Sequence, residues 1–92
     1  FIISMTGKEY FEKFSSDFKN KSNDEVISAF NNEVGDISDK GWGTARASLL
    51  DAIHNEFNIR NLDYSEIGND ESLSFKSKIV LKGNKITIAN NG

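Results

Sequence analysis

The hydrophobic positions of the first 61 residues repeat at the spacing of α-helices. This pattern predicts a first helix over residues 7–19, a second from Asn23 to a stop at Gly35, and a third from Thr44 to about Asn61. The first two helices each follow a hydroxyl residue that has a glutamate three positions later, which is the pattern of a capping box. The apolar stripes are, in order, Tyr10, Phe11, Phe14 and Phe18; Val26, Ile27, Phe30 and Val34; and Ala45, Leu49, Ile53 and Phe57.

Near the C-terminus the pattern changes to the alternation of β-strands. We expect an antiparallel hairpin over residues 74–89, with a two-residue turn at Gly83-Asn84 in which glycine takes the first position of a type II′ turn. The expected register places Leu81 opposite Ile86, Ile79 opposite Ile88, and Lys82 opposite Lys85. One face of the hairpin is then apolar, and the other carries Lys76, Lys78, Lys82 and Lys85.

These elements predict an α+β fold, in which a three-helix unit is followed by a C-terminal antiparallel β-hairpin. Winged-helix domains have this element order. We expect a single domain over residues 1–92, with residues 1–5 a tag or a disordered N-terminus. Within it, residues 6–61 form the helical part, 62–73 a short helical turn and loop, and 74–89 the hairpin. Leu62, Tyr64 and Ile67 are expected to cover the open end of the core.

The composition excludes several kinds of site. The 92 residues include no cysteine and a single histidine, His54, so disulfides, thiolate chemistry and the usual zinc ligand sets are excluded. No apolar run approaches the roughly 18 residues of a membrane span. No glycine-rich phosphate loop or calcium loop is present. We therefore expect a cytoplasmic protein without cofactor or metal.

Charge is divided unevenly along the chain. All fourteen carboxylates lie within residues 1–71, whereas the residues from Ser72 onward contain four lysines and no acidic residue. Lysines opposed across a hairpin destabilise it slightly, so stability does not explain them. Two explanations stay open: the lysine face binds phosphates or acidic groups, or it keeps an exposed sheet edge from pairing with other chains.

The third helix gives little support to DNA recognition. A helix that reads a groove needs Arg, Lys, Asn or Gln near its start, whereas the outward positions expected here are Thr44, Ala47, Ser48, Asp51, His54, Asn55 and Asn58. Lys40 and Arg46 are the nearby cations, and Arg46 could instead support Trp42 or pair with a carboxylate. Trp42 lies between two glycines, where it either fills the core or forms a stacking platform.

No catalytic site is expected from the sequence. His54 follows Asp51 by three residues, but one convex helix face cannot form a triad pocket, so His54 is expected to be exposed. Glu56 is expected to be an ordinary surface charge. The sequence therefore favours a small non-enzymatic binding module that engages another protein or a second copy of itself. The alternative is a winged-helix-like nucleic-acid-binding protein that uses the four hairpin lysines, with Lys40 and Arg46 in support.

Overall fold

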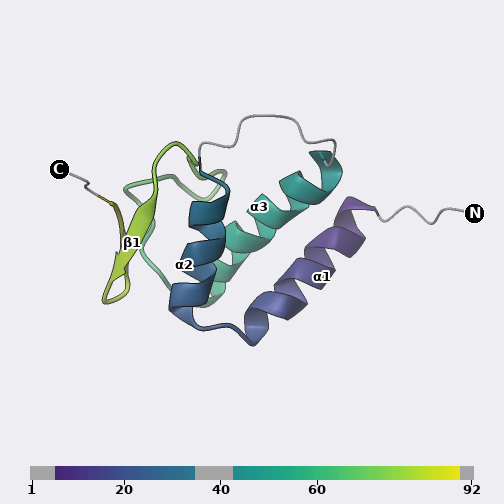
Figure 1. Ribbon diagram of the computed structural model, residues 1–92, viewed down its shortest axis with the longest axis horizontal. Coiled ribbons are helices and arrows are strands. Elements are labelled where there is room, and N and C mark those ends of the chain that lie inside the picture. Colours follow the sequence, from purple (N-terminus) through teal and green to yellow (C-terminus); the bar gives the residue numbers. More distant parts are fainter. Residues whose placement is uncertain (1–5, 35–42, 90–92) are drawn as a thin grey trace, which may run out of the picture.

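The computed structural model describes residues 6–34 and 43–89, which form three helices followed by an antiparallel hairpin (Figure 1). This arrangement confirms the predicted α+β fold. The helices are α1 (Gly7–Lys19), α2 (Asn23–Asn32) and α3 (Gly43–Ile59), and the strands are β1 (Ile79–Lys82) and β2 (Lys85–Ile88). The expected stop at Gly35 and the connection that follows it lie outside the described residues.

Both predicted capping boxes are present. At the start of α1, the Thr6 N–H donates to Glu9 Oε1 at 2.9 Å, and the Glu9 N–H donates to Thr6 Oγ1 at 3.2 Å. Ser22 and Glu25 repeat the exchange at the start of α2, at 2.8 and 3.1 Å. These reciprocal bonds satisfy main-chain donors that have no partner inside a helix, so each helix begins at its cap.

The end of α3 reverses the chain toward the hairpin. Asn61 has a positive φ of 57°, a conformation that asparagine tolerates better than most residues. The Leu62 N–H donates to the Phe57 carbonyl at 2.9 Å, and the Asn61 N–H donates to the Asn58 carbonyl at 3.1 Å. This pair of bonds is a Schellman motif. It ends the helix at Ile59, two residues earlier than predicted, and directs Leu62 into the core.

The core lies where α2 and α3 meet the hairpin. α1 packs along α3, while α2 contacts both α3 and β1 (Figure 1). The Phe30 ring stacks on Phe75, with centroids 4.2 Å apart, and lies 6.1 Å from Phe57. Tyr64 and Ile67 are buried, which confirms that they cover the core. The buried cluster consists of Phe18, Val26, Ile27, Phe30, Ala52, Ile53, Phe57, Leu62, Tyr64, Ile67, Ile79 and Ile86.

The hairpin has the predicted register, with Ile79 opposite Ile88 and Lys82 opposite Lys85. Gly83 has a φ of 64°, and Asn84 does not share the positive φ, which is the pattern of a type II′ turn. Regular pairing begins only at Ile79, after bends at Lys76 and Ser77.

The apolar face of the hairpin is buried unevenly. Ile79 and Ile86 are fully buried, but Ile88 is 44% exposed. The helices therefore leave this end of the apolar face partly uncovered.

Two α3 residues expected at the surface are buried instead. Ser48 is buried because α1 packs against its side of α3, and its hydroxyl donates to the Gly7 carbonyl at 3.0 Å. Glu56 is 2% exposed, and it pairs with Arg60 one turn later, where Arg60 Nε lies 2.7 Å from Glu56 Oε2. The buried face of α3 is therefore wider than its apolar stripe, because polar residues with partners extend it.

Candidate interaction surfaces

The outward edge of β1 is occupied by a side chain of α2. Asn31 donates from Nδ2 to the Ile79 carbonyl at 3.0 Å, and its Oδ1 accepts from the Ile79 N–H at 2.8 Å. The amide thus pairs with Ile79 as a neighbouring strand would, using its donor and its acceptor together. Asn31 and Ile79 are 48 positions apart in the sequence, so no local pattern could reveal this contact.

The edge of β2 is occupied by the segment that follows α3. Asp63 forms a parallel bridge with Lys85: its N–H donates to the Asn84 carbonyl at 2.7 Å, and its carbonyl accepts from the Ile86 N–H at 2.8 Å. Farther along the same edge, the Ile88 N–H donates to Glu66 Oε1 at 3.4 Å.

Each edge of the sheet is therefore only partly free. Among the described residues, the outward N–H and C=O of Leu81 on β1 and the outward carbonyls of Ile86 and Ile88 on β2 have no hydrogen-bond partner. An exposed edge invites pairing with other chains, but here the chain's own residues cover part of it. Edge protection consequently explains less of the lysine content than the sequence suggested.

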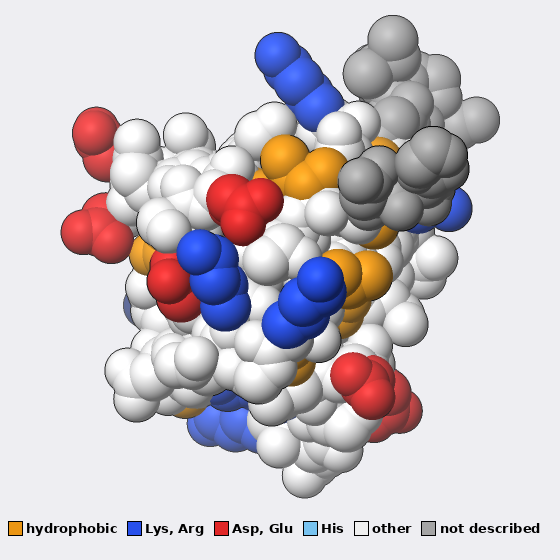
Figure 2. All heavy atoms as spheres, turned by 90° about the vertical axis from the view of Figure 1, so that its left-hand side faces the viewer, with side chains coloured by type: hydrophobic (Ala, Val, Ile, Leu, Met, Phe, Trp, Pro, Cys, Tyr) orange, Lys and Arg blue, Asp and Glu red, His pale blue; other side chains and the backbone are white. Residues whose placement is uncertain are grey.

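The lysines lie on the side of the hairpin that faces away from the core. We define the outer hairpin face by residues that alternate with the buried ones: Lys78, Val80, Lys82, Lys85 and Thr87. Val80 at its centre is 38% exposed. Figure 2 views this side of the molecule, and it shows basic side chains spread over the surface with acidic ones among them. An apolar centre with a charged rim is the arrangement found in protein interfaces.

Acidic side chains adjoin this face, which the sequence did not predict. Asp63 lies beside Lys85, and hydrogen bonds from Ser65, followed by the nearby charge of Lys85, hold the pKa of the Asp63 carboxyl below its usual value. Lys76 lies apart from the outer hairpin face and shares a small hollow with Glu66. Fold contacts thus place carboxylates next to lysines that are far from any acid in the sequence.

Arg46, which was expected to support the lysines, contacts an acidic residue instead. Arg46 forms a salt bridge in which its Nε lies 3.0 Å from Glu33 Oε1, and it also donates to the Glu33 carbonyl at 3.1 Å. The alternative in which Arg46 pairs with a carboxylate is therefore correct. Lys40 and Trp42 lie outside the described residues.

A second surface feature lies between α3 and the loop before the hairpin. A hollow of about 240 Å³, which we call the α3 hollow, has an apolar floor and a carboxylate on each wall, Asp51 on α3 and Glu71 on the loop. Its lining residues are Ala47, Leu50, Asp51, His54, Glu71, Ser72, Leu73 and Phe75. The two carboxylates would repel phosphates from this side of α3.

The loop wall of the α3 hollow is held in place by several contacts. Gly68 bridges to Leu73, and a Cβ at Gly68 would lie 2.3 Å from the Ser72 carbonyl oxygen, so the turn requires glycine. Asn69 Oδ1 accepts from the N–H groups of Glu71 and Ser72. These bonds fix the main chain of the wall that carries the Glu71 carboxylate.

Tyr64 fastens this loop to α3. Its hydroxyl lies 2.6 Å from Asn58 Oδ1 and 3.1 Å from Asp70 Oδ1. Burial, followed by the hydrogen bond to Asp70, raises the pKa of Tyr64. The neutral hydroxyl therefore joins the helix to the loop.

His54 is half-buried, so the expectation of an exposed histidine is wrong. Its ring packs edge-on against Tyr64, with centroids 5.1 Å apart. Its Nε2 is buried and has no hydrogen-bond partner among the described residues. The cause is the chain reversal after α3, which lays Tyr64 against a helix face that the sequence suggested was free.

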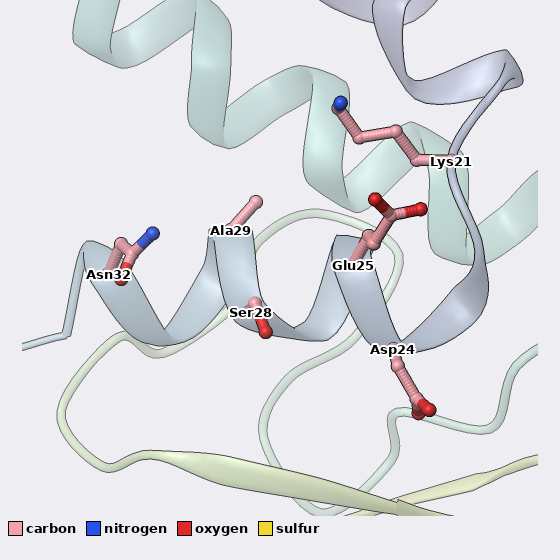
Figure 3. Close-up of a pocket in the computed structure, with 6 residues that line it drawn as sticks. All are labelled: Lys21, Asp24, Glu25, Ser28, Ala29 and Asn32. Carbon is pink, nitrogen blue, oxygen red and sulfur yellow. The ribbon is translucent and has the colours of Figure 1, made fainter.

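A third hollow, of about 390 Å³, lies along the outside of α2 (Figure 3). Figure 3 shows Glu25 lying next to Lys21, while Asp24 points away from both. Glu25 already belongs to the capping box of α2. The two carboxylates therefore do not converge in this hollow.

Within residues 6–34 and 43–89, no three His, Asp or Glu side chains gather as a metal ion would require. In the same ranges, no helix is both long enough and apolar enough to span a bilayer. Comparisons of the chain with protein-family models, curated proteins and solved structures find no match. The proposals below consequently rest on the geometry of the chain itself.

Proposed function

We propose that this chain is a small, non-enzymatic, cytoplasmic binding module whose outer hairpin face docks on an acidic surface of a protein. The observation that carries the proposal is that Asn31 and Asp63 already occupy part of each sheet edge, yet the lysines remain. Lys82 and Lys85 face each other across the strands, an arrangement that costs stability. A binding role accounts for lysines that edge protection does not require.

The shape of the outer hairpin face suits a protein partner. Val80 supplies an exposed apolar centre, and the flanking lysines would neutralise carboxylates on the partner. Charges at the rim of an interface mainly raise the rate of association and select the partner. We therefore expect salt-sensitive binding with modest affinity.

Nucleic-acid binding remains the competing proposal, and it is less favoured. The element order agrees with it, but Asp51, on the side of α3 expected to face outward, and Glu71 opposite it would repel phosphates. Arg46, which was expected to support the lysines, is engaged with Glu33. Lysines of the hairpin alone would have to supply the phosphate contacts.

The test compares an acidic polypeptide with duplex DNA as a probe. Fluorescence anisotropy would measure the binding of labelled poly-glutamate and of a labelled duplex at low and at physiological salt. We expect poly-glutamate to bind, and we expect the variant Lys82→Glu plus Lys85→Glu to lose that binding. The control Lys8→Glu plus Lys13→Glu makes the same change in net charge on the exposed side of α1, and it should still bind.

Two outcomes would overturn this assignment. If the hairpin variant binds poly-glutamate as the control does, the outer hairpin face is not the docking surface. If the duplex binds in preference to poly-glutamate, and its log affinity falls with log salt at a slope of roughly −3.6, as four phosphate contacts require, the nucleic-acid proposal replaces ours.

A further inference from the structure

The tip of the hairpin and the α3 hollow have complementary charges. Lys82 and Lys85 flank the turn on one face of the hairpin, and both are exposed. Asp51 and Glu71 stand on opposite walls of the α3 hollow, and both are also exposed. Neither carboxylate forms a salt bridge within the described residues. Two cations on one surface thus match two anions on another.

The α3 hollow also suits the apolar part of a lysine side chain. Its floor includes Leu50, Leu73 and Phe75, which are all partly buried. Lysine can lay its methylene groups along such a surface while its ammonium group stays at the charged rim. A volume of about 240 Å³ is below the usual range for small-molecule sites, about 300–1,000 Å³, but it accommodates long side chains from a protein.

The hairpin tip cannot fill the hollow of its own molecule without breaking contacts. Asp63 donates to the Asn84 carbonyl in the turn at 2.7 Å and accepts from the Ile86 N–H at 2.8 Å. These bonds hold the tip against the segment that follows α3. None of the residues lining the α3 hollow belongs to β1 or β2.

We propose that the chain associates with a second copy of itself, with the tip lysines Lys82 and Lys85 of one copy seated in the α3 hollow of another, beside Asp51 and Glu71. This inference rests on the proposed function, since it names a second copy as the acidic partner of the outer hairpin face. The contact joins two different surfaces, so repetition gives either a closed ring or an open chain of copies. Its ion pairs are exposed, so the association is weak and salt-sensitive.

A charge exchange between the two surfaces tests this inference. One variant carries Lys82→Glu plus Lys85→Glu, and the other carries Asp51→Lys plus Glu71→Lys. Sedimentation at low salt, from about 20 µM to about 1 mM because weak contacts need high concentration, should show the unmodified chain assembling above the monomer mass. Each variant alone should stay monomeric. An equimolar mixture should assemble again, because every contact between unlike variants then joins opposite charges.

The control Lys8→Glu plus Lys13→Glu should assemble as the unmodified chain does. Circular dichroism would establish that each variant is folded, and recovery of assembly in the mixture would itself require two folded partners. The inference is overturned if the unmodified chain stays monomeric throughout the range, if either variant assembles alone, or if the mixture does not assemble. A monomeric chain whose hairpin still binds poly-glutamate would leave the proposed function standing and refute self-association alone.

Discussion

Replacing Arg60 with alanine should remove a large part of the stability of the fold. The Arg60 guanidinium donates to Glu56 Oε2, Asn23 Oδ1, and the carbonyl oxygens of Phe18 and Lys21, each at 2.7 Å. These groups belong to the last turn of α3, to the end of α1, to the start of α2 and to the connection between α1 and α2. A single side chain therefore clamps this connection to the last turn of α3.

The size of this loss of stability depends mainly on Glu56, whose side chain is 3% exposed. Without Arg60, its carboxylate would be buried and unpaired, which costs about 3–5 kcal/mol in comparable cases. A folded chain of this size has about 5–14 kcal/mol of stability, at roughly 0.05–0.15 kcal/mol per residue. The Arg60→Ala protein should be marginally folded, with a far lower midpoint in urea denaturation followed by circular dichroism.

A second substitution separates the cost of the unpaired Glu56 carboxylate from the cost of the other hydrogen bonds that Arg60 makes. Adding Glu56→Gln to Arg60→Ala replaces the unpaired carboxylate with a neutral amide, so the double variant should recover about 1–3 kcal/mol relative to Arg60→Ala. Arg60→Lys should retain the positive charge but lose most of the fork of hydrogen bonds. A cost below about 1 kcal/mol for Arg60→Ala, or a double variant no more stable than Arg60→Ala, would refute this reasoning.

Three further predictions concern the contacts that shape the two surfaces. Asn31→Ala should cost about 1–3 kcal/mol, because it leaves two main-chain groups of Ile79 unpaired, and amide exchange at Ile79 should accelerate; unchanged exchange would contradict the edge contact. Gly68→Ala should destabilise the fold by about 1–3 kcal/mol through overpacking against the Ser72 carbonyl, and the largest changes in NMR chemical shift should be at residues 69–73. Larger chemical-shift changes outside this segment would contradict the prediction. Tyr64 has a raised pKa, so its neutral form contributes stability that is fully present below about pH 10 and is lost as the pH rises through the folded pKa. The free energy of unfolding of Tyr64→Phe should therefore fall less steeply at alkaline pH than that of the unmodified chain. Parallel curves of unfolding free energy against pH for the two proteins would contradict this.

The sequence predicted those parts of the fold that depend on neighbouring residues. The capping boxes at Thr6 and Ser22, the Gly83 turn and the hairpin register all follow from local chemistry, since each involves residues close together in the chain. Arg60 shows the limit of this reasoning. Its spacing of four residues from Glu56 could have indicated the pair, but its bonds to the α1–α2 connection could not.

The surroundings of α3 were predicted less well, for a physical reason. Helical periodicity shows which positions are apolar, but it does not show which polar positions later segments will cover. His54 is half-buried because Tyr64 returns against it, and Glu56 is buried with its Oε2 paired to Arg60. The α3 hollow likewise depends on loop residues 71–75, which begin 17 positions after His54, the last helix residue that lines it. Such contacts arise from tertiary packing, which no single helix encodes.

The same long-range contacts change what the hairpin lysines mean. From the sequence, a hairpin at the end of a small fold has two open edges, and lysine is a common means of protecting them. In the structure, Asn31 occupies one edge through a contact that spans 48 positions, and Asp63 occupies the other. Protection is thus supplied by groups that also hold the hairpin to α2 and to the end of α3. The opposed pair Lys82 and Lys85 is left with a cost in stability and less edge to protect, which is why we propose a charged partner.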